Sequence, residues 1–173
     1  MFLALQLAPA PKAQTSTAPG RVSISHFGRV SATYYRGGQP IGRQYAELAA
    51  LGVRAVVDLK HDGTAEATLV RRLGMSFYSI PMTTSAAPSD AQVIQFLKIV
   101  NDPANQPVFV HCEGGHDRTG AMTAIYRLTH DRWPVERAYA EMKRNGYNSA
   151  VAGPALKTFV FDYARRFDLP GRP

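Results

Sequence analysis

The sequence of 173 residues contains a single cysteine, Cys112, and no apolar run close to the ~20 residues that a membrane-spanning helix requires. One cysteine excludes an internal disulfide and a cysteine-rich zinc site. We also find no internal repeat and no second domain in the pattern of the chain. Apolar residues make up 45% of the chain and charged residues 19%, which is ordinary for a soluble globular protein. These absences leave one domain with one hydrophobic core.

The charge is unbalanced toward positive residues, with 20 Lys and Arg against 13 Asp and Glu, for a net charge of +7. An excess of positive charge favours an anionic partner. The alternative interpretation is that the charge only keeps the protein soluble. The basic residues are scattered rather than arranged in a stripe with aromatics, which argues against nucleic acid. We therefore expect a phosphorylated small molecule or a phosphoprotein as substrate. The oligomeric state stays open.

The first twenty residues differ in composition from the rest. A short apolar start, Met1–Leu7, is followed by Ala, Pro, Ser and Thr, and no basic segment precedes it. We expect residues 1–20 to form an N-terminal tail and residues 21–173 to form a single domain. If the apolar start is the end of a trimmed signal peptide, the protein is exported to the periplasm; otherwise it is cytoplasmic.

Strand and helix patterns alternate along the chain and then give way to helices. Strands are expected at residues 31–36, 53–59, 76–82 and 107–112, the last of them central. Helices are expected at residues 40–51, 64–73, 90–100 behind a Ser89 cap, 118–129, 134–144 and 155–167, with a loop at 101–106. This order predicts an α/β fold in which helices flank a mostly parallel central sheet.

The most informative segment runs from the predicted central strand into the following helix. Cys112 ends the strand, and after five intervening residues Arg118 opens the helix. Gly114 and Gly115 let the backbone curl so that several N–H groups face one anion. The positive end of the helix dipole points to the same place, and the Arg118 guanidinium can hold two phosphoryl oxygens at once. The segment predicts a binding site for a phosphate group.

The same groups favour the thiolate form of Cys112, which makes it a nucleophile that can attack phosphorus. The Thr119 hydroxyl is placed to donate to the sulfur when the sulfur later leaves. His111 is expected to hydrogen-bond to backbone and hold the loop in shape. Glu113 would add its backbone N–H to the phosphate site with its side chain turned outward, and His116 lies at the rim, where it can reach a second phosphate or an aromatic ring.

The motif His111-Cys112, five residues, then Arg118-Thr119-Gly120 resembles the phosphate-binding loop of the cysteine-dependent protein tyrosine phosphatase superfamily. The segments Tyr35–Pro40 and Val56–Lys60 resemble the start of small dual-specificity-like phosphatases, and the His-Cys-Glu start of the loop is also similar to bacterial phytases of the tyrosine-phosphatase type. The resemblance covers residues 30 to 150. It implies a dual-specificity-type fold and hydrolysis of phosphomonoesters through phosphocysteine, and we expect neither a cofactor nor a metal.

The sequence departs from this family at the acid that protonates the leaving group. Aligned without a gap, the chain places Thr84 where the family has an aspartate, and a hydroxyl is too weak an acid for that task. Asp117 is one replacement, because myotubularin-type phosphatases resemble the chain in having an aspartate at that step of the loop. Asp90 is the alternative, although it also suits a helix N-terminus. Substrate or water is the third source of the proton.

Lys60 and His61 follow a predicted parallel strand, at the edge where open α/β sheets bind ligands. We expect them to contact substrate phosphates. With the basic charge and the phytase-like loop, they favour inositol polyphosphates as substrate, and protein phosphotyrosine is the alternative. A non-catalytic phosphate-binding pseudophosphatase, a different class of function, stays open because the usual acid is missing.

Overall fold

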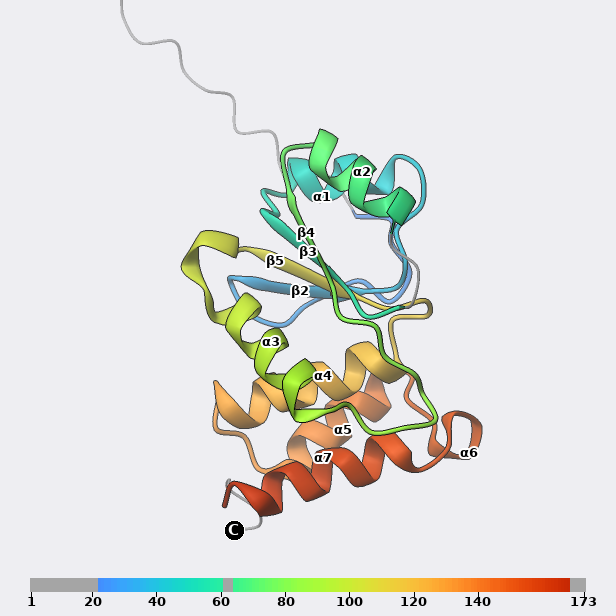
Figure 1. Ribbon diagram of the computed structural model, residues 1–173. Helices are drawn as coiled ribbons and strands as arrows, with labels where there is room; N and C mark the ends of the chain where they lie inside the picture. The colour runs from blue at the N-terminus through green and yellow to red at the C-terminus, as the bar shows by residue number, and fades with distance from the viewer. Residues whose placement is uncertain (1–21, 61–63, 169–173) are drawn as a thin grey trace, which may run out of the picture.

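The computed structural model describes residues 22–60 and 64–168, and its centre is a sheet of five strands in the order β1-β2-β5-β3-β4 (Figure 1). The strands are β1 (Gly28–Arg29), β2 (Tyr34–Gly37), β3 (Ala55–Asp58), β4 (Ser76–Ser79) and β5 (Val108–His111). β5 pairs in parallel with both β2 and β3, β3 pairs in parallel with β4, and only β1 is antiparallel to its neighbour. The predicted mostly parallel sheet and its central strand are confirmed.

Helices cover both faces of this sheet, as Figure 1 shows. They are α1 (Gln44–Ala50), α2 (Thr64–Arg72), α3 (Asp90–Asn101), α4 (Asp117–Thr129), α5 (Val135–Arg144), α6 (Ser149–Ala152) and α7 (Ala155–Arg166), with a 3-10 turn, η1 (Pro103–Asn105). Helices α1 and α2 lie on one face, and α3, α4, α5 and α7 form a thicker layer on the other. No helix in the described part of the chain is both long and apolar enough to cross a bilayer.

The alternation of side chains along the central strands divides the core into two clusters. Val56 and Phe109 pack with α1 and α2, whereas Val57, Val108 and Val110 pack with α3, α4 and the C-terminal helices. Every residue of β3 and β5 is buried, which explains why their sequences are nearly continuous apolar runs. Full burial of each such side chain contributes about 2 kcal/mol.

Three parallel strands end at the same edge of the sheet. In register, Gly37 of β2 and Asp58 of β3 both lie opposite His111 of β5. Segments that are far apart in the sequence, directly after residues 37, 58 and 111, therefore meet at one place. This is the edge at which ligands bind in open parallel sheets.

The structure also differs from the sequence prediction in several elements. Helix α1 begins at Gln44 rather than at Pro40, because residues 42–43 form a turn with Gly42 at a φ of 52°. The short elements β1 and α6 were not predicted, and η1 lies within the predicted loop at 101–106. The capping box that Ser89 forms with Gln92 confirms the predicted start of α3. The predicted tail at residues 1–20 lies outside the described residues.

Candidate active site

The loop between β5 and α4, residues 112–116, contains Cys112, the only cysteine of the sequence, and places its sulfur beside a backbone N–H group. Cys112 is 2% exposed, and the Gly115 N–H donates to its Sγ at 3.3 Å. A hydrogen bond from an N–H group favours the charged form of an acceptor, here the thiolate. The predicted curl of the loop toward the sulfur is present.

Gly115 is where this loop touches the end of β2. It has a φ of 80°, and a Cβ on it would lie 2.5–2.7 Å from backbone atoms of Gly37 and Gly38. Such contacts leave no space for any side chain. At Gly114 a Cβ would come within 2.2 Å of the His116 ring, which lies against this residue. Glycine is therefore required at Gly115 by close contacts with backbone, whereas a side chain at Gly114 would require the His116 ring to shift.

Arg36 supports the loop from the interior of the protein. It lies on β2, is 2% exposed, and donates from Nη2 to the carbonyl oxygen of Gly115. Burial lowers the pKa of Arg36, and the nearby Cys112 opposes this shift. Sequence analysis missed this residue, although one signal was present: an arginine inside an otherwise apolar strand, directly before Gly37-Gly38.

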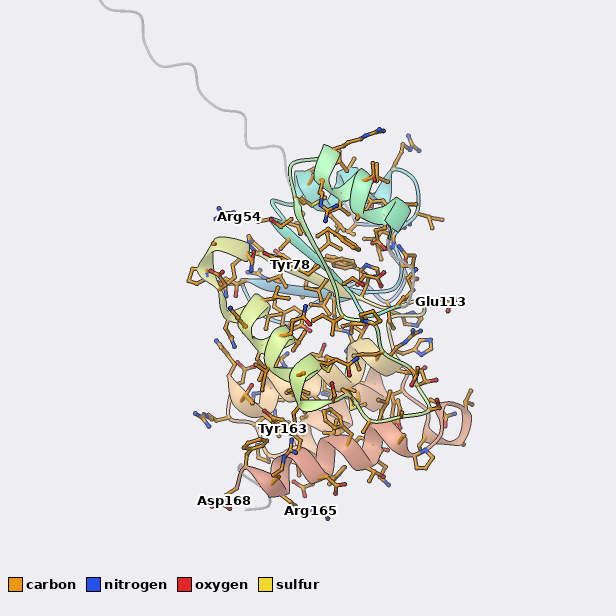
Figure 2. All side chains as sticks on the ribbon, in the orientation of Figure 1. Arg54, Tyr78, Glu113, Tyr163, Arg165 and Asp168 are labelled. Atoms are coloured by element: carbon orange, nitrogen blue, oxygen red, sulfur yellow. The ribbon has the colours of Figure 1, made fainter. Side chains whose placement is uncertain are left out.

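A backbone hydrogen bond holds the outer part of the loop to the segment after β2. The Gln39 N–H donates to the Glu113 carbonyl at 2.9 Å, and that segment is itself tied down by the Gly38 N–H, which donates to the Ser25 carbonyl at 2.8 Å. The Glu113 side chain is exposed, and Figure 2 shows it at the outer edge of the molecule. This position agrees with the expectation that its carboxylate turns away from a bound anion.

Arg118 and Thr119, in the first turn of α4, carry polar atoms that the protein itself does not use. The buried Nε of Arg118 has no hydrogen-bond partner among the described residues, and its Nη1 makes only a long contact of 3.5 Å to the Met82 carbonyl. Thr119 is fully buried, and its Oγ1 also has no partner in the described part of the chain. A buried donor without a hydrogen-bond partner costs folding free energy. The presence of such donors beside the loop therefore indicates a site that can bind a hydrogen-bond acceptor.

His111 connects the loop to two buried carboxylates. Its Nδ1 lies 3.2 Å from the Cys112 carbonyl oxygen and 3.9 Å from Asp58 Oδ1, and its Nε2 lies 2.8 Å from Glu66 Oε1. Burial raises the pKa of Asp58. Burial alone would raise the pKa of Glu66 as well, but the contact with His111 outweighs it and holds that pKa below its ordinary value. The position of His111 agrees with its expected support of the loop, and the two carboxylates were missed.

These three side chains also form the one group in the described residues whose donor atoms lie close enough to hold a cation, within 4.8 Å of one another. The sequence analysis expected no metal and did not anticipate this cluster. His111 Nε2 already faces Glu66 at hydrogen-bonding distance, and Asp58 Oδ1 accepts from the Lys60 N–H at 2.8 Å. We therefore assign the cluster to polar and charge contacts within the protein.

The rim of the site holds an Asp–His pair. His116 Nδ1 lies 3.2 Å from Asp117 Oδ2, and their side chains are 36% and 19% exposed. The His116 ring also meets the edge of His26 with 5.4 Å between the ring centres. Asp117 thus lies at the first residue of α4 and is accessible to solvent, as an acid that serves a bound substrate must be.

Asp90, the alternative acid, lies elsewhere. Its carboxylate pairs with Arg166 of α7, with 2.6 Å between Oδ1 and Nη2. A cavity of about 460 Å³ beside this pair is lined by residues 85–88 and by α7, without a residue of the Cys112 loop. Of the two predicted basic contacts, Lys60 is half-buried directly after β3, and His61 lies outside the described residues.

Residues 20–157 match the family described as "PTP-NADK: DSP-PTPase phosphatase fused to NAD+ Kinase". The chain belongs to this phosphatase family. The membership confirms the predicted phosphatase superfamily.

Curated relatives carry related names. The chain is 32% identical over 121 residues to the dual specificity protein phosphatase TpbA of Pseudomonas aeruginosa, a match that covers 69% of this chain and 54% of TpbA. The chain thus spans about half the length of that relative. It is 28% identical over 151 residues to inositol diphosphatase DSP1 of Oryza sativa, covering 84% of this chain and 68% of DSP1.

Solved structures support the fold. The crystal structure of TpbA superposes with a TM-score of 0.69 at 26% identity, covering 80% of this chain and 84% of that one. The catalytic domain of the PP-IP phosphatase SIW14 from S. cerevisiae superposes with a TM-score of 0.68 at 20% identity, covering 84% of this chain and 94% of that one. The tyrosine-phosphatase-like fold predicted from the sequence is confirmed.

Proposed function

We propose that the protein hydrolyses phosphomonoesters through a phosphocysteine intermediate, with inositol polyphosphates as its substrates. The observation that carries the proposal is the arrangement around Cys112: a backbone N–H already donates to the sulfur, while Arg118 Nε and Thr119 Oγ1 stay without partners in the described residues. A phosphoryl group in the loop would accept hydrogen bonds from the unused donors. The site thus supplies a nucleophile and the charge that a phosphate dianion requires.

In the first step the Cys112 thiolate attacks phosphorus, and the bond between phosphorus and the leaving oxygen breaks. The guanidinium of Arg118 and the loop N–H groups stabilise the three equatorial oxygens. The leaving oxygen takes the proton of Asp117, whose carboxyl group lies at the rim beside His116. The products are an alcohol and phosphocysteine.

In the second step water attacks the phosphocysteine. Asp117, now ionised, accepts the proton of the water, and the sulfur departs as thiolate. Thr119 Oγ1 donates to the departing sulfur, a role that fits its full burial and its lack of another partner within the described part. Inorganic phosphate leaves, and the thiolate is restored.

Several features support inositol polyphosphates. The net charge is +7, and Lys60 lies at the sheet edge beside the loop. The relatives DSP1 of Oryza sativa and DSP3 of Arabidopsis thaliana are named inositol diphosphatases. A polyanion gains more from such surroundings than a monophosphate does.

Phosphotyrosine in proteins is the second candidate, and one specific observation favours it. TpbA has been crystallised with phosphotyrosine, and that structure superposes with a TM-score of 0.68 at 25% identity. The TpbA sequence is also 32% identical to this chain in the aligned part.

Rates on phytate, a phosphotyrosine peptide and a phosphoinositide, measured side by side, test the substrate. We expect kcat/KM to be highest for phytate; a higher value for the peptide would replace this proposal with the second candidate. Cys112→Ser tests the mechanism, because it should abolish turnover and keep phosphate affinity. If the wild-type protein binds phosphate but fails to turn over p-nitrophenyl phosphate, whose leaving group needs almost no acid, the protein is a binding module instead.

A further inference from the structure

We propose that Arg36 is the interior counter-charge of the Cys112 thiolate and the brace that fixes the phosphate loop, and therefore a positioning residue for the reaction. The inference rests on the proposed function for its catalytic meaning. The pairing itself, in which a buried cation keeps the sulfur ionised, does not depend on whether the loop catalyses a reaction or only binds an anion.

A buried guanidinium needs a negative partner, because desolvation of an unpaired charge costs several kcal/mol. Arg36 is 2% exposed, and its Nε and Nη1 have no hydrogen-bond partner among residues 22–60 and 64–168. Three acidic groups raise the pKa of Arg36 through their negative charge: Tyr34, Glu141 and Cys112.

Two of these three groups cannot serve as the counter-charge. Burial raises the pKa of Tyr34 well above its usual range, so its hydroxyl stays neutral. Glu141 already forms a bidentate pair with Arg127, at 2.8 and 2.9 Å. Cys112 is left as the group whose negative charge can compensate Arg36.

The geometry links Arg36 to the sulfur through one residue. Gly115 accepts from Arg36 Nη2 with its carbonyl and donates to Cys112 Sγ with its N–H. Gly115 also lies so close to the backbone of Gly37 and Gly38 that no side chain fits at this position. By holding the Gly115 carbonyl toward the interior, Arg36 keeps that oxygen out of the anion site.

Arg36 differs from Arg118 in where it acts. Arg118 is part-exposed, opens α4, and can reach the outer oxygens of a bound phosphate. Arg36 comes from β2, is buried, and donates to the Gly115 carbonyl of the loop. Arg118 can therefore bind the phosphate ligand, while Arg36 compensates the negative charge of the Cys112 thiolate before a ligand binds.

Other charged groups also lie around the loop. They are Asp58 on β3, Lys60 after β3, Glu66 on α2, His111 on β5, and His116, Asp117 and Arg118 at the start of α4. All of them remain unchanged in a variant of Arg36, so a change in the pH profile of that variant reports the loss of this one charge.

The test is the rate at which iodoacetamide alkylates Cys112 as a function of pH, which needs no substrate. Arg36→Gln keeps an N–H donor for Gly115 but removes the charge, so the pH of half-maximal rate should rise by about one unit, a tenfold loss of thiolate below that pH. Arg36→Lys keeps the charge and should stay near the wild type. Arg29→Gln is the matched control, because Arg29 is exposed on the neighbouring strand β1.

An Arg36→Gln profile that coincides with the wild type, or an equal shift in Arg29→Gln, would overturn the proposal. If Arg36→Gln does not fold, the wild-type protein provides the test: the Arg36 Nε–Hε signal in NMR should titrate with the same midpoint as Cys112 alkylation, and its failure to move would refute the pairing. Failure of turnover with a normal Arg36 result would refute the proposed function alone.

Discussion

The chemistry of the site is concentrated in a few atoms whose partners are missing or unusual. Cys112 Sγ accepts from a backbone N–H, Thr119 Oγ1 has no partner in the described part of the chain, and the Asp117 carboxylate lies 3.2 Å from a histidine that is itself half-exposed. A protein that served stability alone would pair these groups or replace them with apolar ones. The arrangement therefore supports the proposed binding of an oxyanion, which would share these hydrogen bonds.

At this scale we predict that Asp117 is the acid. In Asp117→Asn, substrates with poor leaving groups, such as alkyl phosphates, should slow by about 10²–10⁴-fold, because the amide cannot protonate the leaving oxygen. Aryl phosphates with good leaving groups should slow by less than about tenfold. Steady-state kcat for both substrates checks the prediction.

Asp90→Asn is the matched control for Asp117→Asn, since Asp90 is the alternative acid and pairs with Arg166 away from the loop. It should affect both kinds of substrate little. A selective loss in Asp90→Asn, or an equal loss for both substrates in Asp117→Asn, would show that the acid has been assigned to the wrong residue.

Helix α4 is buried along most of its length, and its first turn contributes to the candidate site. Its orientation must therefore satisfy both the core and the site. Its C-terminal end is tied to its neighbours by Arg127, which pairs with Glu141 of α5 at 2.8 Å and with Asp131 of the connecting segment at 2.6 Å. The guanidinium also lies over the Trp133 ring, 4.1 Å from its centre. This network fixes the angle at which α4 and α5 pack.

We predict that Arg127→Met lowers the free energy of unfolding by about 3 kcal/mol, because two partly buried carboxylates lose their partner. Arg137→Met is the control: Arg137 stacks on the same Trp133 ring, at 3.6 Å, but is exposed. It should cost under about 1 kcal/mol. Urea denaturation at pH 7 measures both, and equal losses would exclude the carboxylates as the cause.

The same network gives a pH dependence. Burial alone would raise the pKa of Asp131, but the hydrogen bonds and positive charges of Arg127 and His130 together outweigh it and hold that pKa below its ordinary value. The pair therefore stabilises the wild-type protein above the unfolded value of roughly 4 and loses this contribution as the pH falls through the lower folded value. Arg127→Met should lose less stability over that acidic range than the wild type does.

The elements were predictable from sequence where a periodic pattern and a cap coincide. The Ser89 cap, the apolar strand before Cys112 and the helix that ends at Thr129 all agree with the structure. β1 has two residues and exists only through its pairing with β2, so no local pattern could predict it. Strand order depends on contacts between distant segments and follows from the fold.

The difference between local sequence patterns and contacts of distant segments also explains which parts of the site could be predicted. The proposed phosphate site consists mainly of backbone groups of adjacent residues, so the sequence from Cys112 to Arg118 was sufficient to propose it. Arg36 reaches the loop because β2 ends beside it, and Glu66 reaches His111 because α2 begins there. Both are charged residues at buried positions, but burial could not be assigned before the elements had been packed together.

On the scale of the whole molecule, the positive charge of the chain acts at longer range than any contact. With a net charge of +7, the protein attracts a polyanion more strongly than a monoester, and salt screens this attraction. Raising the ionic strength from ~0.02 M to ~0.5 M should raise KM for phytate about tenfold and for p-nitrophenyl phosphate about twofold, with little change in kcat.

Two salts with different anions, chloride and acetate, should give the same KM values at equal ionic strength. A difference between them would indicate competition for the phosphate loop rather than screening. An equal response of both substrates would contradict a role of the overall charge in choosing the substrate.

The single sulfur at the base of the loop also determines how the protein responds to oxidants. A thiolate is the form that peroxide converts to sulfenic acid, and neighbouring thiols usually rescue it by forming a disulfide. Cys112 is the only cysteine among the 173 residues, so no second thiol of this sequence can do so. Recovery from such oxidation therefore depends on a small reductant that can enter the buried loop where phosphate would bind.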